Sequence, residues 1–209
     1  MDQSLPNALN QESLLAGVSY LTQIDPDLKE IIDGFGNPPL WSRKPGFPTL
    51  IHIILEQQVS LASARAAFNK LSNSVGELTP GRFLEYTDYQ LREFGFSRQK
   101  TNYGRELAKA ILSGDINLKG LHHLNDSAAR QKLTQIKGIG HWTADIYLLM
   151  AHLRPDIWPS GDLALAKAVQ RVKKLDEKPG PERLNAIAEP WKPWRAVAAR
   201  ILWHFYLSA

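Results

Sequence analysis

The sequence predicts an all-α protein, and three observations support this prediction. Apolar residues recur at helical spacing along most of the chain, and no segment alternates as a half-buried strand would. Three X-Pro dipeptides, at 25–26, 79–80 and 192–193, each place a proline where the first turn of a helix accepts it. The segment 50–55 is apolar almost all round, as expected for a helix at the centre of a core.

Capping residues, prolines and glycines divide the periodic segments into a series of expected helices. In order, these are 10–23, 26–34, 48–58, 61–75, 80–86, 88–94, 98–113, 126–135, 141–153, 163–175, 181–189 and 193–207. We expect two lobes with a cleft between them. Helices in 1–46 pack with the C-terminal lobe, 47–160 forms the central lobe, and 161–209 completes the second lobe.

Composition limits the classes of function. The 209 residues, 44% of them hydrophobic, suffice for one large domain or two small ones. The chain has 25 basic and 21 acidic residues, a net charge of +4. This mild excess is compatible with binding to nucleic acid but does not by itself indicate it. The absence of cysteine excludes disulfides, thiolate zinc sites, cysteine nucleophiles and cysteine-held iron–sulfur clusters. Without a signal peptide or an apolar run of about 20 residues, we expect a soluble intracellular protein.

A helical hairpin at about 126–153 is the most informative local feature. Gly138 and Gly140 flank Ile139, and we expect both glycines to allow the positive φ of a tight turn and the approach of another molecule. The amides that open the second helix, around 140–142, have no acceptors within that helix and carry the positive end of its dipole. Such a turn suits a phosphate and grips a nucleic-acid backbone without reading sequence.

Asp162 closes the loop that follows this hairpin. It precedes an amphipathic helix, so one interpretation is an N-cap, whose amides and dipole favour the charged form. A fixed anion is also what a sugar cation in a transition state requires, and the two interpretations are compatible.

Two tryptophans leave alternatives open. Trp142 either packs in the core with Ile146 and Leu149 or faces a pocket. Trp203 lies off the apolar stripe of its helix, on a face that we expect to be unsuited to a core because it holds Ala196, Ala199 and Arg200. It therefore packs between lobes or forms a pocket wall, and we favour the wall.

The polar segment 57–60, which contains Gln57, Gln58, Val59 and Ser60, also has two interpretations. It is either the polar end of a helix or a set of short side chains that fill space in a duplex. The histidines show no spacing typical of metal ligands.

Taken together, several motifs resemble the helix-hairpin-helix DNA glycosylases of base excision repair, and specifically the 3-methyladenine DNA glycosylase II (alkyladenine) branch. The resemblance covers about 47–206. Its motifs are ILEQQVS at 54–60, GFSRQKTNYGRELAKAI at 95–111, IKGIGHWTADIYLL at 136–149, PSGD at 159–162 and WKPWRAVAARILW at 191–203.

The resemblance implies roles for individual residues. Asp162 matches the catalytic aspartate, and Trp142 stands where members with lyase activity have lysine, which implies a monofunctional enzyme. Trp203 matches a pocket tryptophan, Ile146 stands where some relatives have a pocket tyrosine, and Gln58 matches the wedge. The implied DNA contacts are Gln57, Gln58, Val59, Ser60, Lys137, Gly138, Ile139, Gly140, His141 and Thr143.

The implied reaction is release of an alkylated base, such as 3-methyladenine or 7-methylguanine, from double-stranded DNA after base flipping. No cofactor or iron–sulfur cluster is required, although the resemblance implies a sodium or potassium ion on the backbone carbonyls of Thr134, Ile136 and Ile139. We expect a monomer, located in the cytoplasm with the nucleoid in a bacterium or in the nucleus in a eukaryote.

Three other functions remain open. The hairpin could belong to a non-catalytic DNA-binding module, which would bind DNA without releasing a base. The enzyme could act on uracil, hypoxanthine or an oxidised purine. The aromatic residues could instead serve a helical protein-interaction domain.

Overall fold

The computed structural model describes residues 8–209, and this part of the chain is helical without any strand. The all-α prediction is confirmed. The α-helices are α1 (Gln11–Ile24), α2 (Pro26–Phe35), α3 (Phe47–Glu56), α4 (Leu61–Val75), α5 (Pro80–Glu85), α6 (Asp88–Phe94), α7 (Arg98–Leu112), α8 (Asp126–Thr134), α9 (His141–Met150), α10 (Leu163–Val172), α11 (Pro181–Ala188) and α12 (Arg195–Ser208). Within residues 8–209, no helix combines the length and apolar character needed to cross a membrane.

The ends of these helices differ from the predicted ends by at most three residues. Two short 3₁₀-helices, η1 (Leu118–His123) and η2 (Glu189–Trp191), were not predicted. The caps predicted at two X-Pro pairs are present: the Asp25 side chain accepts from the amides of Asp27 and Leu28, and the Thr79 side chain accepts from Arg82.

The third X-Pro prediction is wrong. Pro193 does not begin the last helix, because the Trp194 amide donates to the Trp191 carbonyl at 2.8 Å and closes a turn first. Helix α12 then begins at Arg195, with Trp194 at its N-cap.

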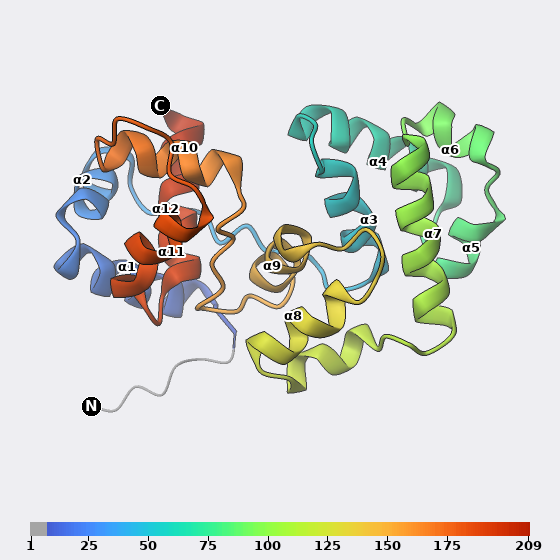
Figure 1. Cartoon of the computed structure of the whole chain (residues 1–209), viewed down its shortest axis with the longest axis horizontal. Coiled ribbons are helices and arrows are strands. Elements are labelled where there is room, and N and C mark those ends of the chain that lie inside the picture. The colour runs from blue at the N-terminus through green and yellow to red at the C-terminus, as the bar shows by residue number, and fades with distance from the viewer. Residues whose placement is uncertain (1–7) are drawn as a thin grey trace. The chain divides into compact units, whose positions relative to one another are not determined.

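The chain divides into two compact units, whose residues can be followed in Figure 1 by the colour of the ribbon, which gives the residue number. Of the described residues, unit 1 contains 8–42 and 148–209, and unit 2 contains 43–147. The boundaries thus fall after Ser42 and within α9, whereas the sequence placed them after 46 and 160.

Unit 1 is built around α12, which contacts α1, α2 and α10. Gly17 on α1 permits the close approach of these helices, because a Cβ there would lie 2.9 Å from side-chain atoms of Trp194 and Val197. Every residue of α12 from Ala196 to Trp203 is buried. The expectation that its Ala196–Ala199–Arg200 face is unsuited to a core is therefore wrong.

Arg200 explains how a charged residue occupies this core. Its guanidinium group is fully buried and donates to three carbonyls, those of Leu40 at 2.8 Å and of Ala196 and Leu149 at 2.9 Å each. Burial lowers the pKa of Arg200 to about 10, so the group still carries its charge at neutral pH.

Unit 2 is built around α3, which contacts α4 and α7, while α7 also packs against α5 and α6. The predicted central segment is buried as expected, with Leu50, Ile51, Ile53, Ile54 and Leu55 at most 1% exposed. Gly104 on α7 brings α5 close, since a Cβ there would lie 2.6 Å from the ring of Phe83.

Candidate functional site

Asp162 occupies the N-cap of α10 in unit 1. Its Oδ1 accepts the amide of Leu165 at 2.8 Å, which confirms the capping interpretation. Its own amide donates to the carbonyl of Pro159 at 2.9 Å, so the preceding Pro-Ser-Gly segment forms a tight turn. Local sequence thus fixes both the backbone and the side chain of this carboxylate.

Trp203 on α12 also contacts this carboxylate. Its indole Nε1 donates to Asp162 Oδ1 at 3.1 Å, and its side chain is 7% exposed. The carboxylate is therefore oriented by a backbone amide and an indole N–H. Preorganised donors of this kind avoid the cost of reorienting dipoles during a reaction.

The predicted hairpin is present in unit 2, where α8 leads through a short turn into α9. Gly138 has φ +93°, and a Cβ there would lie 2.1 Å from Cγ of Tyr103, so this position requires glycine on two grounds. The amide of Ile139 donates to the carbonyl of Ile136 at 3.0 Å and closes the turn, and the Ile139 side chain is buried.

Gly140 differs from Gly138. It does not have a positive φ, so the expectation that both glycines need one is wrong for this residue. No atom lies within 4 Å of a Cβ built on Gly140, and the residue is exposed. Gly138 is covered by Tyr103, whereas Gly140 leaves the backbone accessible at the start of α9.

An ion pair joins the two helices of the hairpin. Arg130 Nε on α8 donates to Asp145 Oδ1 on α9 at 2.6 Å. Burial raises the pKa of Asp145 above its ordinary value, although the charge and hydrogen bond of Arg130 act in the opposite direction.

The segment 57–60 lies between α3 and α4. Gln58 is exposed and has φ +57°, a conformation that is uncommon for any residue other than glycine, and Val59 is 46% exposed. Ser60 caps α4 through the amide of Ser63. Gln57 points inward instead, where its side-chain amide donates to the carbonyl of Gly138 and to Oγ1 of Thr143, each at 2.9 Å.

The structure separates the predicted DNA contacts by their exposure. Gly138 is partly covered and Ile139 is buried in the hairpin turn. Gln57 and Thr143 bond to each other, and Thr143 is only 2% exposed. The exposed members are Gln58, Val59, Ser60, Lys137, Gly140 and His141. Of the predicted base-pocket residues, Trp142 is half-buried and Ile146 is buried, both on the unit 2 part of α9.

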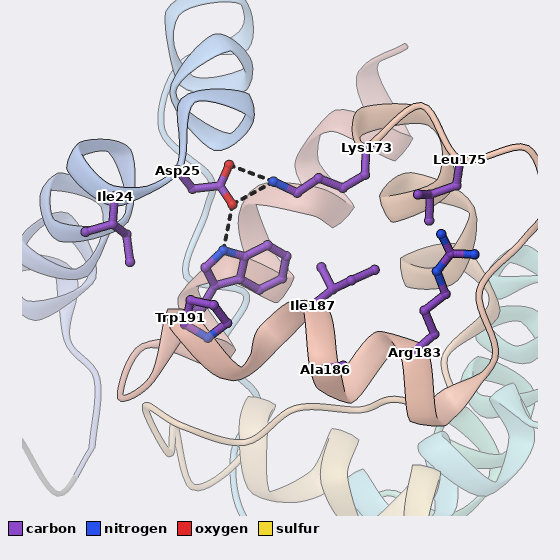
Figure 2. A pocket seen from close by; sticks show the side chains of 9 residues that line it. Ile24, Asp25, Lys173, Leu175, Arg183, Ala186, Ile187 and Trp191 are labelled. Carbon is purple, nitrogen blue, oxygen red and sulfur yellow. Dashed lines mark hydrogen bonds and ion pairs between the residues drawn. The ribbon is translucent and has the colours of Figure 1, made fainter.

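A cavity of about 430 Å³ in unit 1 contains none of the predicted site residues. Figure 2 shows the ion pair on its wall, in which Lys173 Nζ donates to both oxygens of Asp25 at 2.8 and 2.7 Å. Lys173 Nζ also donates to Oδ2 of Asp27 at 2.8 Å, and the indole Nε1 of Trp191 donates to Oδ2 of Asp25 at 2.7 Å. No local pattern predicts this network, because Lys173 and Trp191 are 148 and 166 positions from Asp25.

This network lowers the pKa of Asp25. Burial alone would raise the pKa of Asp25, but hydrogen bonds from Lys173 and Trp191, the charge of Lys173 and the amide of Leu28 together lower it below its ordinary value. Burial would lower the pKa of Lys173, but the hydrogen bonds and charges of Asp25 and Asp27 raise it above its ordinary value. All the charged partners lie in unit 1, so the network stabilises the fold of that unit.

Comparisons with known proteins agree with this arrangement of elements. The DNA-3-methyladenine glycosylase 1 of Schizosaccharomyces pombe is 29% identical over 198 residues, which are 91% of this chain and 87% of that protein. The structure of the S. pombe 3-methyladenine DNA glycosylase in complex with abasic DNA matches with a TM-score of 0.85 and 28% identity, covering 90% of this chain and 95% of that one.

A DNA-3-methyladenine glycosidase from Bacillus halodurans matches with a TM-score of 0.74 and 27% identity, covering 92% of this chain and 88% of that one. Residues 51–193, more than half of the chain, match the HhH-GPD superfamily of base excision DNA repair proteins. The chain therefore belongs to the HhH-GPD superfamily.

Proposed function

We propose that this protein is a monofunctional DNA glycosylase that releases alkylated bases of the 3-methyladenine and 7-methylguanine type from double-stranded DNA. The observation that carries the proposal is the carboxylate of Asp162, which the Leu165 amide and the Trp203 indole hold in one orientation. The relatives named 3-methyladenine glycosylases, matched over nearly the whole chain, support the choice of substrate.

The reaction breaks the bond between C1′ of the deoxyribose and the base nitrogen. An alkylated purine already carries positive charge, so the bonding electrons leave with it as a neutral base and no general acid is needed. The sugar passes through an oxocarbenium-like state, which the negative charge of Asp162 stabilises. Water then adds its oxygen to C1′ and releases a proton, leaving an abasic site.

DNA is held and opened by unit 2 in this proposal. The exposed backbone at Gly140 and the first turn of α9 bind a phosphate. Gln58, at the exposed tip of the 57–60 turn, enters the stack and takes the space of the flipped nucleotide. Trp142, Ile146 and Trp203 remain the proposed contacts of the extruded base, where an indole attracts a cationic ring by about 0.5–2 kcal/mol.

The product is an intact abasic strand. Trp142 offers no amine at the position where the resemblance places the lysine of lyases, so no Schiff base forms with the sugar. We expect the protein to act as a monomer, and strand scission after base release should require a separate enzyme or alkali.

The hairpin turn is also the proposed site of a sodium or potassium ion, on the carbonyls of Thr134, Ile136 and Ile139. Neutral carbonyl oxygens suit such hard cations, and the Ile136 carbonyl is oriented in the turn by the amide of Ile139. Replacing Na⁺ and K⁺ by tetramethylammonium at constant ionic strength should then weaken DNA binding.

The decisive experiment incubates the protein with randomly methylated DNA and identifies the released bases by chromatography. Asp162→Asn keeps an oxygen that accepts from Leu165 and Trp203 but removes the charge. We expect it to bind DNA normally and to release bases at least about 100-fold more slowly, as for loss of several kcal/mol of electrostatic stabilisation. Asp176→Asn, the same change at an exposed position of unit 1, should keep the wild-type rate.

Near wild-type release by Asp162→Asn would contradict the catalytic assignment. DNA binding by the wild type without release of any base would indicate a non-catalytic module. Release from single-lesion duplexes that contain uracil, hypoxanthine or an oxidised purine, but not from methylated DNA, would indicate a glycosylase for another lesion.

A further inference from the structure

The turn between α3 and α4 presents side chains outward from a fixed base. Gln57 is the C-cap of α3, and its backbone amide donates to the carbonyl of Ile54. Ser60 is the N-cap of α4. Between them, Gln58 and Val59 are exposed, and Gln58 adopts the left-handed conformation. Such a conformation persists only where neighbouring structure enforces it.

Gln57 links this turn directly to the hairpin. Its Nε2 carries two hydrogens, and the two acceptors at 2.9 Å, the Gly138 carbonyl and Thr143 Oγ1, use both of them. One acceptor lies in the hairpin turn and the other in the first turn of α9. The acceptors are 81 and 86 positions away in the sequence, so this contact is purely tertiary.

Helix α7 holds both sides of this link. Lys100 Nζ donates to the carbonyl of Leu55 at 2.7 Å and so caps the end of α3. One turn later, the ring of Tyr103 covers Gly138 so closely that any side chain there would overlap it. The end of α3 and the hairpin turn are thus anchored on the same helix, with Gln57 bridging them.

From this geometry we infer that Gln57 is a positioning residue, which holds the Gln58–Val59 tip at a fixed place relative to the hairpin backbone. This inference rests on the proposed function, in which the hairpin holds a phosphate and the tip enters the duplex. Gln57 itself does not contact DNA. It links the tip rigidly to the hairpin, so that the hairpin bound to a phosphate holds the tip in place while the tip opens the duplex.

Gln57→Leu tests this inference because it preserves the size of the side chain and removes both hydrogen bonds. We expect affinity for undamaged duplex to change less than about 3-fold, since the hairpin backbone remains. Single-turnover release of 7-methylguanine paired with cytosine should fall about 10-fold, because flipping a well-paired base requires the tip. Gln23→Leu, at an exposed glutamine of unit 1, should match the wild type.

The substrate provides the readout that a merely structural role would not change. When the same 7-methylguanine lies in a mismatched pair, less work is needed to flip it, so Gln57→Leu should lose less than about 3-fold. Equal losses on paired and mismatched substrates would overturn the inference.

A double-mutant cycle tests whether Gln57 acts through Gln58. If it does, Gln57→Leu should slow release less than about 2-fold once Gln58→Ala has removed the tip side chain. An undiminished effect in that background would overturn the inference.

Thr143 provides a second variant in case Gln57→Leu unfolds the hairpin. Thr143→Val removes one of the two acceptors and should show a smaller loss with the same dependence on pairing, whereas Thr143→Ser should restore the wild-type rate. A wild type that releases no base from any substrate would defeat the proposed function, whereas wild-type turnover with unaffected Gln57→Leu would defeat only this inference.

Discussion

In unit 1 the proposed functional group is a charged side chain held by its neighbours, whereas in unit 2 it is a backbone turn held by side chains. Asp162 is oriented by an amide and an indole of its own unit. The hairpin is supported by Tyr103, Gln57 and the Arg130–Asp145 pair. A side chain can be exchanged while its surroundings remain, but a backbone turn is altered only through the residues that support it. Chemistry and DNA grip should therefore respond to different mutations.

The largest expected effect on stability concerns the core of unit 1. Arg200→Met removes a buried cation and leaves the carbonyls of Leu40, Ala196 and Leu149 without that donor. We expect a loss of about 3–5 kcal/mol in the free energy of unfolding, measured by denaturant titration. The exposed Arg183→Met should change it by less than about 0.5 kcal/mol, and equal losses would contradict the role of Arg200.

The two glycines of the hairpin sharpen the comparison within unit 2. Gly138→Ala should cost about 2–4 kcal/mol in the free energy of unfolding, because a methyl group meets Tyr103 on a backbone with positive φ. Gly140→Ala should leave stability nearly unchanged but weaken binding to undamaged duplex several-fold, because its methyl group obstructs a phosphate. Thermal unfolding and fluorescence anisotropy separate the two effects, and identical behaviour of both variants would contradict this division.

The acids of the two units should respond to pH in opposite directions. The pKa of Asp25 is lowered in the folded state, so its stabilising contribution is present above the unfolded pKa of about 3.9 and is lost as the pH falls through the folded pKa. Asp25→Asn should cost about 1–3 kcal/mol at pH 7, and this cost should shrink as the pH falls through the folded pKa.

For Asp145 the pKa is raised, so folding is favoured below the unfolded pKa and stability declines as the pH rises through the folded one. Denaturant titrations of Asp25→Asn and Asp145→Asn between pH 2 and pH 7 compare the two. Parallel pH profiles would refute the opposite signs.

The smallest expected effect is on the orientation of the carboxylate. Trp203→Phe keeps an aromatic ring but loses the pyrrole part of the indole, whose N–H donates to Asp162, while the Leu165 amide remains. Single-turnover base release should fall about 10-fold, with unchanged affinity for DNA, as for one hydrogen bond to a charged group. Trp158→Phe is the matched control, because the buried Trp158 Nε1 has no hydrogen-bond acceptor among residues 8–209. A similar decrease in both variants would show that Trp203 acts through packing alone.

Local signals in the sequence accounted for most helix boundaries and for the N-cap role of Asp162, because caps and apolar periodicity depend on residues within one or two turns. The 3₁₀-helix at Leu118–His123 lacks such periodicity and was missed. The burial of Arg200, on a face that the sequence indicates is unsuited to a core, could not be predicted, because two of its carbonyl acceptors, Leu40 and Leu149, lie far along the chain.

The inward position of Gln57 could not be predicted for the same reason. Both of its partners lie more than 80 positions away, and the sequence showed only two adjacent glutamines. That they point in opposite senses, one into the hairpin and one to solvent, depends on the positive φ of Gln58.

The discontinuity of unit 1 has a consequence for biosynthesis. Unit 2 is one continuous stretch of chain, so all of its residues have been made once residue 147 has been added. Helices α1 and α2 are made first, yet α12, against which both pack, is made last. During translation the residues of the unit proposed to bind DNA are therefore complete before those of the unit that carries Asp162, and α1 and α2 are made long before the helix against which they pack.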